Sequence, residues 1–552
     1  MKGFLAGVAL MAVISLFIQA KSTDSLFEIS KNLDIFATLF KELNSYYVDP
    51  IEPGKLVKTG IDAMLEDLDP FTNYITESDI EEYEFQTTGK YGGIGATMRK
   101  KGDDIYIGDI YENSPAFKAG IQSGDMLISI EGNQVKGKTI EDISILLKGS
   151  PGTQVAVNVK DAYTGIESQK TIVRGEIEVS SVPFAGFVGK DKNIVYIKLT
   201  QFTFGCGRQI RNLLDSFKKV KPDLKGVVLD VRNNPGGLLD EAVNVCNVFM
   251  DRGQLIVSTK GKLPEWDKDY KTALNPLDSK IPLTVLINHS SASASEIVAG
   301  TAQDLDRGVT IGERSYGKGL VQITRPLGYN ARLKLTTAKY YTPSGRCIQA
   351  IDYSNRNADG SVGKIPDSLK KAYITKGGRK VLSGGGVEPD VPLAPEQLSK
   401  LGIILYSKSF LFDYATQYVK QNKTIAPAGA FSLSDAEFNN FAKWLEGKEY
   451  SYQSETEVSL DSLKAIATRE KYFDAIKNEF SSLQTKVAHD KAQDIQKHKA
   501  EIKKLLENEI VSRYYYLRGR IENSLASDND LNKAIELIEQ PAKYQALLQP
   551  KK

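Results

Sequence analysis

This 552-residue sequence has little histidine, little cysteine and almost no excess of charge of either sign. Three histidines and no H-E-x-x-H motif leave little basis for a zinc-dependent hydrolytic centre. The three cysteines, Cys206, Cys246 and Cys347, are too few and too scattered for a disulfide framework or a metal site. With 71 basic and 69 acidic residues the net charge is +2, which gives no reason to expect nucleic acid or an anionic membrane as a partner.

The chain is too long for one compact core, so we expect two to four domains. Its one long apolar run, residues 4–18, follows Lys2 and precedes Gln19-Ala20-Lys21. This pattern is typical of a secretory signal peptide over residues 1–20, with an uncleaved membrane anchor as the alternative. No later stretch reaches the 18 apolar residues of a second span. We therefore expect the remaining chain to be soluble and extracytoplasmic, in the periplasm.

Residues 21–86 are predicted to form an N-terminal helical segment. Apolar side chains recur at helical spacing in residues 33–43, which predicts helices over 32–46 and 53–68. Such a stripe indicates packing or a homodimer and carries no chemistry.

Residues 87–178 contain a glycine-rich loop, an alternating strand at 104–110, the sequence GDMLISIEG at 124–132 and a helical stretch at 139–147. In this order the motifs resemble a PDZ domain of the type found in bacterial proteases. Gly92, Gly93 and Gly95, with Ile94 between them, would let several N–H groups converge on the carboxylate of a peptide tail. The peptide would then add as a strand beside this loop. The alternative is a tight turn without a ligand.

Residues 179–392 alternate apolar strands with helical stretches. The pattern predicts an α/β core with a mixed, largely parallel sheet. Binding sites in such sheets lie at the carboxyl ends of the strands. The expected strands are 194–199, 226–231, 283–288 and 333–339, and the expected helices are 209–220, 238–250 and 294–305.

Three loops of this core carry polar or glycine-rich sequences. RNNPGG at 232–237 joins a strand to a helix, where backbone N–H groups can bind an anion. SASASE at 291–296 could be only a helix cap, because Ser293 and Glu296 form a capping-box pattern. YGKG at 316–319 sets Lys318 between two glycines, which could be an ordinary loop lysine. Taken alone, RNNPGG could equally be a plain glycine-permitted turn, and each of the other two loops favours the structural interpretation.

Read together with Gln322 and YTPSGR at 341–346, the three loops resemble those of the C-terminal processing (tail-specific) peptidases. The resemblance covers residues 30–392, including the PDZ insertion. It implies a serine endopeptidase with Ser293 as nucleophile, Lys318 as base and Gln322 as the residue that positions the lysine. It also implies an oxyanion hole made by the amide of Ala294 and that of Gly236 or Gly237. No metal and no cofactor are expected.

A lysine base fits the scarcity of histidine. His289 stands four residues before Ser293 and is predicted to be a rim residue, while the other two histidines lie in the charged tail. A free lysine titrates near pKa ~10.4, so the fold must lower that pKa by about 3 units, or roughly 4 kcal/mol, to make it a base. Glu296 and Asp304 are predicted to be capping and helix-surface residues.

Residues 393–552 are predicted to form a charged helical extension. Apolar residues recur at helical spacing between 473 and 487, and the charge runs indicate solvated faces. We expect protein or peptide substrates with accessible C-termini and no nucleic acid. Two alternatives remain at this point: a non-catalytic peptide-binding scaffold or chaperone on the same fold, and a hydrolase of a non-peptide ester.

Overall fold

The computed structural model describes residues 26–450, 452–487 and 491–550 of the chain. It divides into two compact units, one made of residues up to 76 with 324–335 and one made of residues 77–323 with 336–552. The predicted signal peptide, residues 1–20, lies outside the described residues. Within the three described ranges, no helix is both long and apolar enough to cross a membrane.

The smaller unit contains two helices and a short strand. One helix covers residues 26–46, and α2 covers Pro53–Glu66, close to the two helices predicted for this segment. A proline begins α2, where its missing N–H is no loss because the first N–H groups of a helix have no partner within it. Strand β1 (Asn73–Ile75) pairs antiparallel with residues 332–334 of β18 (Arg332–Tyr341).

The larger unit is built around a six-stranded sheet in the order β10-β11-β12-β15-β16-β23. β10 runs antiparallel to β11, and the other neighbours are parallel. β12 and β15 are buried along their whole length, as expected for parallel strands covered on both faces. The bounds are β10 (Phe184–Val188), β11 (Ile194–Lys198), β12 (Gly226–Asp230), β15 (Leu283–Ile287), β16 (Val309–Gly312) and β23 (Val391–Pro392). The predicted α/β core is thereby confirmed.

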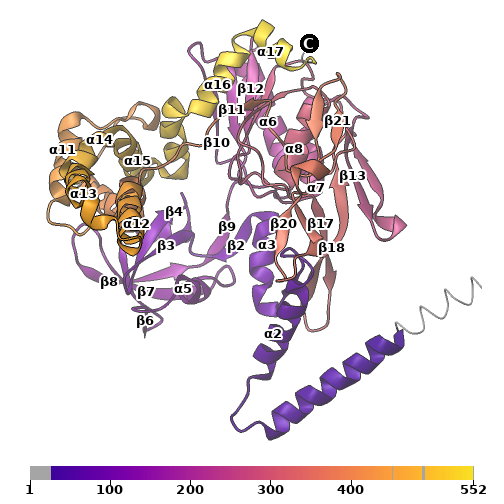
Figure 1. The fold of residues 1–552 in the computed structure, drawn as a ribbon, viewed down its shortest axis with the longest axis horizontal. Coiled ribbons are helices and arrows are strands. Elements are labelled where there is room, and N and C mark those ends of the chain that lie inside the picture. The colour runs from indigo at the N-terminus through magenta and orange to yellow at the C-terminus, as the bar shows by residue number, and fades with distance from the viewer. Residues whose placement is uncertain (1–25, 451, 488–490, 551–552) are drawn as a thin grey trace, which may run out of the picture. The chain divides into compact units, whose positions relative to one another are not determined.

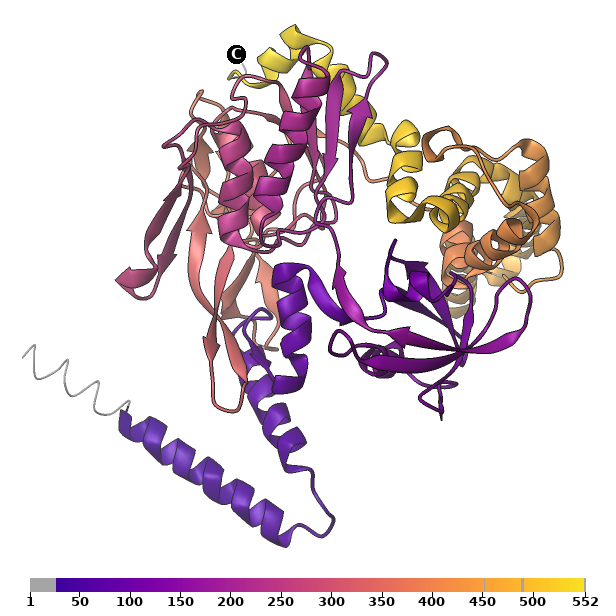
Figure 2. The same ribbon diagram turned by 180° about the vertical axis from the view of Figure 1, so that it is seen from behind.

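Helices cover both faces of this sheet (Figures 1 and 2). One face packs against α6 (Cys206–Val220), α7 (Leu239–Phe249) and α8 (Ala294–Asp304). The other face packs against α16 (Asn529–Ile538) and α17 (Pro541–Leu547), the yellow helices in Figure 1. Both helices fall within the segment predicted to be a charged extension, 393–552. They belong instead to the core, because their apolar side chains close the second face of its sheet.

A second, smaller set of strands lies beside this core. β18 pairs with β17 (Leu320–Pro326) and with β13 (Leu255–Gly261), which pairs in turn with β14 (Lys268–Lys271). The predicted strand at 333–339 is part of β18 and so is not a strand of the parallel sheet. Two short pairs complete this region: β19 (Ile351–Arg356) with β20 (Val362–Lys364), and β21 (Ala372–Ile374) with β22 (Lys380–Leu382).

The segment predicted to resemble a PDZ domain folds as a β-rich module with its own apolar core. Its sheet runs β3-β4-β5-β7-β8, with β6 beside β5, and its main helix is α5. Strands β2 (Lys90–Gly93) and β9 (Gly175–Glu178) pair with each other, so the chain enters and leaves the module through one two-stranded ribbon. The bounds are β3 (Ala96–Lys101), β4 (Asp104–Ile110), β5 (Met126–Ile130), β6 (Asn133–Gln134), β7 (Gln154–Lys160), β8 (Glu167–Val173), α4 (Pro115–Lys118) and α5 (Ile140–Leu147).

Residues 400–524 form a helical domain around a separate apolar core, drawn in orange in Figure 1. Its last helix, α15 (Lys499–Ser524), is kinked at Tyr516, whose φ of 55° and ψ of −159° are not helical. Beyond the kink, α15 leads toward α16 and the six-stranded sheet. The other helices are α9 (Lys400–Ser407), α10 (Phe410–Gln421), α11 (Asp435–Leu445), α12 (Glu455–Arg469), α13 (Phe473–Val487) and α14 (Lys491–Lys497).

Candidate active site

Ser293 occupies a strained turn between the buried strand β15 and helix α8. Its φ of 54° and ψ of −114° place a non-glycine residue in the left-handed half of backbone space. Such a conformation costs of order 1–3 kcal/mol and persists only where the surroundings enforce it, often at active sites. The turn is therefore held in this shape by neighbouring groups, of which Glu296 is the foremost.

The Glu296 carboxylate is fully buried and accepts four hydrogen bonds. Oε1 accepts from the Ser315 hydroxyl at 2.6 Å and from the Gly317 N–H at 2.7 Å. Oε2 accepts from the N–H groups of Ser293 and Lys318, both at 2.8 Å. The backbone nitrogens of Ser293 and Lys318 are thus separated by at most twice 2.8 Å. Burial raises the pKa of Glu296 to about 7, although the hydrogen bonds oppose the shift.

Tyr340 bridges the same two residues from their carbonyl side. Its hydroxyl donates to the Ser293 carbonyl oxygen at 3.1 Å and also contacts the Lys318 carbonyl oxygen. The ring is buried, and burial raises the pKa of the phenol well above its ordinary value, so the hydroxyl stays protonated as a donor. Together with Glu296, it fixes both the N–H and the C=O of Ser293 relative to Lys318.

Lys318 is half-buried in the loop between β16 and β17. The glycines on either side of it are required by close packing. A Cβ on Gly317, whose φ is +89°, would lie 2.4 Å from Cβ of Ala350, and one on Gly319 would lie 2.8 Å from the Gln349 nitrogen. On β17, the Gln322 side-chain NH₂ donates to the Thr336 hydroxyl at 3.1 Å, which leaves its Oε1 as an acceptor.

The RNNPGG loop packs directly against the serine turn. A Cβ on Gly236 would lie 2.8 Å from Cβ of Ser293 and 3.0 Å from the Ala294 nitrogen. The Gly236 N–H, however, donates to Asn234 Oδ1 at 2.9 Å. Within the described ranges, the N–H groups of Gly237 and Ala294 donate no hydrogen bond to the protein. Of the two glycines considered as oxyanion donors, Gly237 is the one whose N–H remains open.

Of the two acidic residues of α8, Glu296 caps the helix as predicted, since it accepts from the Ser293 N–H, whereas the surface prediction for Asp304 is wrong. Glu296 is buried at the centre of the site, and Asp304 is buried against Arg346, 2.8 Å away. The Thr342 hydroxyl and the Ser344 N–H also donate to Asp304. The sequence signal was present in the YTPSGR motif, which supplies all three partners of Asp304 and directly follows Tyr340.

His289 lies at the exposed end of β15. Its Nδ1 is 2.9 Å from Glu313 Oε2, and 71% of its side chain is exposed. No group of three or more histidine, cysteine, aspartate or glutamate side chains in the described part of the chain is placed to hold a metal ion.

In the PDZ-like module, the four residues predicted to bind peptide differ in their positions. Gly92 and Gly93 lie in β2 and pair with β9, whereas Ile94 and Gly95 form the loop into β3. The carbonyls of this loop accept from Ala116 and Tyr111, and its two N–H groups donate to no described residue. Gly95, at φ +76°, has no room for a Cβ, which would lie 2.4 Å from that of Ser114.

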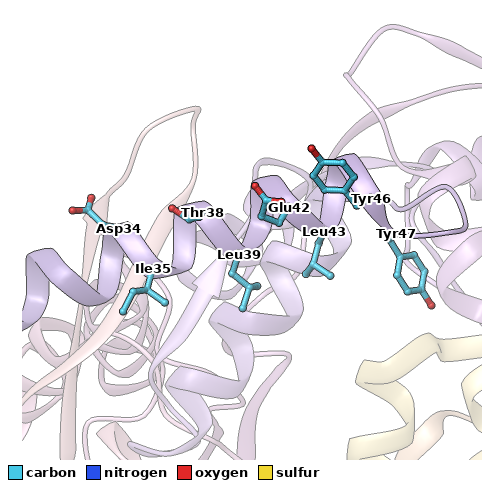
Figure 3. A pocket seen from close by; sticks show the side chains of 8 residues that line it. All are labelled: Asp34, Ile35, Thr38, Leu39, Glu42, Leu43, Tyr46 and Tyr47. Atoms are coloured by element: carbon cyan, nitrogen blue, oxygen red, sulfur yellow. The ribbon is translucent and has the colours of Figure 1, made fainter.

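A separate hollow lies along the helix at residues 26–46 (Figure 3). All of its lining residues belong to one helical segment and none is a predicted catalytic residue: Asp34, Ile35, Thr38, Leu39, Glu42, Leu43, Tyr46 and Tyr47. It has the character of an apolar helix surface and not of a reaction site.

Comparison with known proteins places these features in a class. The model of peptidase family S41 matches residues 193–355, and a PDZ domain model matches 106–161. The model "probable PDZ-protease, C-terminal helical domain" matches residues 401–538. The fold and the matched models together define a serine-type peptidase that carries a PDZ domain.

Individual proteins that this chain resembles are also named as proteases. A carboxy-terminal-processing protease of Bartonella bacilliformis is 37% identical over 350 residues, covering 63% of this chain and 80% of that protein. A probable CtpA-like serine protease of Staphylococcus haemolyticus is 32% identical over 436 residues, covering 78% and 79%. The solved photosystem II D1 C-terminal processing protease is 27% identical, covers 66% and 87%, and has a TM-score of 0.35. This chain belongs to the carboxy-terminal-processing protease family.

Proposed function

We propose that this protein is an endopeptidase that binds the C-terminal tail of protein substrates at its PDZ domain and cleaves them with a dyad of Ser293 and Lys318. The observation that supports this proposal best is the buried Glu296 carboxylate, one oxygen of which accepts from the backbone N–H groups of both residues. This shared carboxylate holds the backbone of the strained serine turn close to that of the glycine-flanked lysine, which supports the proposal that their side chains act together.

The proposed reaction is acyl transfer through an acyl-enzyme. Lys318, neutral in the resting enzyme, takes the hydroxyl proton of Ser293 as the oxygen attacks the scissile carbonyl carbon. The N–H groups of Ala294 and Gly237 stabilise the oxyanion, because that of Gly236 is already bonded to Asn234. Lys318 then protonates the leaving amine, and water hydrolyses the ester in a second round. Gln322 Oε1 would accept from the lysine amine and orient it.

The substrate tail is proposed to bind at the loop of Ile94 and Gly95. Two N–H groups that donate to no residue of the described ranges suit a terminal carboxylate. Among the described strands only β4 pairs with β3, so β3 is an edge strand beside which a peptide can add. Gly92 and Gly93 would support this loop by close packing and not by direct contact, since a Cβ on Gly92 would lie 2.3 Å from the Gly149 carbonyl oxygen.

We place the enzyme outside the cytoplasm, in the periplasm, on the basis of the signal-peptide pattern of residues 1–20. A homodimer is proposed from the helix of Figure 3, because Leu33, Phe36 and Leu39 on it are about half exposed or more. Cell fractionation with mass spectrometry of the N-terminus tests the first point, and light scattering of the purified protein tests the second. An intact N-terminus on a soluble cytoplasmic monomer would contradict both.

The dyad is tested with Ser293→Ala and Lys318→Ala, with the exposed Lys262→Ala as a matched control. Cleavage of an unfolded protein should fall by at least about a thousandfold in the first two variants and stay unchanged in the control. A fluorophosphonate should label Ser293 in the unaltered enzyme. Persistent cleavage by a folded Lys318→Ala protein would refute the lysine as base, and persistent cleavage by Ser293→Ala would refute the nucleophile.

A further inference from the structure

Arg232, the first residue of the RNNPGG loop, is held by three aspartates. Its Nε and one Nη donate to Asp230 at 3.1 and 2.7 Å. Both Nη atoms donate to Asp528, at 3.0 and 2.6 Å, and one of them donates to Asp530 at 3.1 Å. All five N–H donors of the guanidinium are therefore used, four of them in two bidentate pairs. Two of the three acceptors come from a segment about 300 residues further along the chain.

This cluster is largely shielded from water. The side chains of Arg232 and Asp528 are 16% exposed, that of Asp530 is 21% exposed, and that of Asp230 is 1% exposed. Burial alone would raise the pKa of Asp230, but Lys198 and Arg232 hold it well below its ordinary value. Burial alone would lower the pKa of Arg232, but Asp230 and Asp528 raise it. An ion pair in such surroundings is screened little by salt and fixes its partners more firmly than a surface pair does.

From Arg232 the contacts continue into the catalytic turn. The next residue, Asn233, exchanges hydrogen bonds with Asn288 at the end of β15. The carbonyl of Asn234 then accepts from the Ala292 N–H at 3.0 Å and from the Ser295 hydroxyl at 2.9 Å. Ala292 and Ser295 flank the nucleophile on both sides. Through these hydrogen bonds, the position of Arg232 helps to fix the loop that would supply the Gly237 donor. It also helps to fix the turn that carries Ser293.

The aspartates are themselves well anchored. Asp528 caps α16 by accepting from the Leu531 N–H at 3.0 Å. Leu531, Ala534 and Leu537 of this helix are buried against the catalytic sheet. A helix fixed in the core therefore presents two carboxylates to the loop from outside the 193–355 region that the peptidase model matches.

We infer that Asp528 and Asp530 are positioning residues for the RNNPGG loop, so that the C-terminal segment completes the oxyanion side of the active site. This inference rests on the proposed function, since it assumes that the loop supplies an oxyanion donor. Asp230 alone would hold only one side of the guanidinium. The two C-terminal carboxylates hold the other side and prevent the arginine, and the backbone that carries it, from turning away from Ser293.

The test compares Asp528→Asn and Asp530→Asn with Glu536→Gln, which removes an exposed charge on the same helix. Asparagine caps a helix about as well as aspartate, so Asp528→Asn keeps the cap and loses the charged, bidentate contact. With a short peptide substrate, kcat should fall about 10- to 100-fold in Asp528→Asn and about three- to tenfold in Asp530→Asn. These losses are smaller than the roughly 10²–10³-fold loss for removing an oxyanion donor outright, because the donor would be displaced and not removed. KM should change less than about twofold, and Glu536→Gln should match the unaltered enzyme.

A peptide aldehyde, which forms a tetrahedral adduct with the serine, separates positioning from mere stability. Its affinity should fall in Asp528→Asn by the same factor as kcat, while the corresponding peptide alcohol, which has no terminal carbonyl and cannot form an adduct, should bind unchanged. An unchanged kcat in folded Asp528→Asn and Asp530→Asn would overturn the inference, and so would a loss that only follows the folded fraction. If Asp528→Asn does not fold, Asp530→Asn decides by the same criteria. Loss of activity in these variants together with full activity in Ser293→Ala would instead refute the proposed function.

Discussion

At the scale of single residues, Glu296 decides how the site is held together. A carboxylate that accepts four hydrogen bonds uses all of its acceptor positions, and no other side chain of this size offers as many. Two of the donors are the backbone N–H groups of the proposed nucleophile and the proposed base. The residue that the sequence presented as a helix cap therefore sets the relation between the two chemical groups.

Replacing Glu296 with glutamine should strongly impair activity. The amide offers one oxygen and an NH₂ group, so two of the four donors would face another donor and lose their partner. A buried donor without a partner costs about 1–3 kcal/mol, so we expect a destabilisation of a few kcal/mol and a loss of kcat/KM of at least about a hundredfold. Thermal melts and kinetics on the same samples measure both effects. Glu313→Gln is the control, since the Glu313 side chain contacts the exposed His289 and lies outside the hydrogen bonds of Glu296.

Glu296 also predicts opposite pH dependences for stability and activity. Its folded pKa of about 7 lies above the ordinary 4.5, so the stability it contributes is complete below about pH 4.5 and is lost as pH rises through 7. A shift of this size corresponds to about 3 kcal/mol. Activity should instead rise over the same range, because only the ionised carboxylate accepts all four hydrogen bonds.

Denaturant unfolding and kcat/KM, each followed between pH 5.5 and 8.5, check these slopes. The stability slope should flatten in Glu296→Gln, which has no proton to bind at this position. Stability that rises with pH in the unaltered protein, or an unchanged slope in the variant, would show that another group titrates.

At the scale of elements, the sequence predicted the parts of the core that have a strong local signal. The buried strands β12 and β15 and the helices α7 and α8 follow from runs of apolar residues bounded by polar turns. The motif loops identified the residues that the structure brings together around Ser293. Local patterning was sufficient there because each loop joins adjacent elements of one α/β unit.

Features that depend on distant partners were not predictable from the sequence. The strand at 333–339 reads like its neighbours, and only its pairing with β13 shows that it leaves the parallel sheet. The helices α16 and α17 have ordinary amphipathic patterns, which say that a face is buried but not against what. The sequence shows Glu296 as a helix cap and Asp304 as a surface acid, and it does not show that both are buried, because their donors come from residues 315–318 and 342–346.

At the scale of the molecule, the helical domain contacts the PDZ domain through ion pairs. Arg520 of α15 binds Asp109 of β4 at 2.7 and 3.2 Å. Arg99, on the edge strand β3, lies 3.5 Å from Glu509 and 4.4 Å from the ring centre of Phe412. Because Arg99 lies on β3, the helical domain contacts the strand that is proposed to receive the substrate tail.

We expect the double variant Arg99→Gln with Arg520→Gln to loosen this contact. Partly exposed ion pairs contribute up to about 1 kcal/mol each, so losing both should raise the open population by about five- to thirtyfold. Hydrogen exchange in β3 and β4 should speed up accordingly, and high salt should have a similar effect on the unaltered protein. Cleavage of a tailed protein should change, while cleavage of a short peptide without a tail should not.

The control for this experiment is Lys504→Gln, which breaks an ion pair with Glu396 that does not involve the PDZ domain. If hydrogen exchange in β3 and β4 of the double variant matches that of Lys504→Gln, the apolar contacts alone hold the two domains together.

The paired strands β2 and β9 have a consequence for how such a chain can be assembled and taken apart. Gly93 and Gly175 stand opposite each other in the ribbon, so their Cα atoms are only about 5 Å apart, although 81 residues separate them in sequence. A gene segment encoding everything between them could be gained, exchanged or deleted, and a tight turn of two residues would close the gap. The α/β core can thus acquire a different inserted domain between β2 and β9 without any change to the pairing of its own strands.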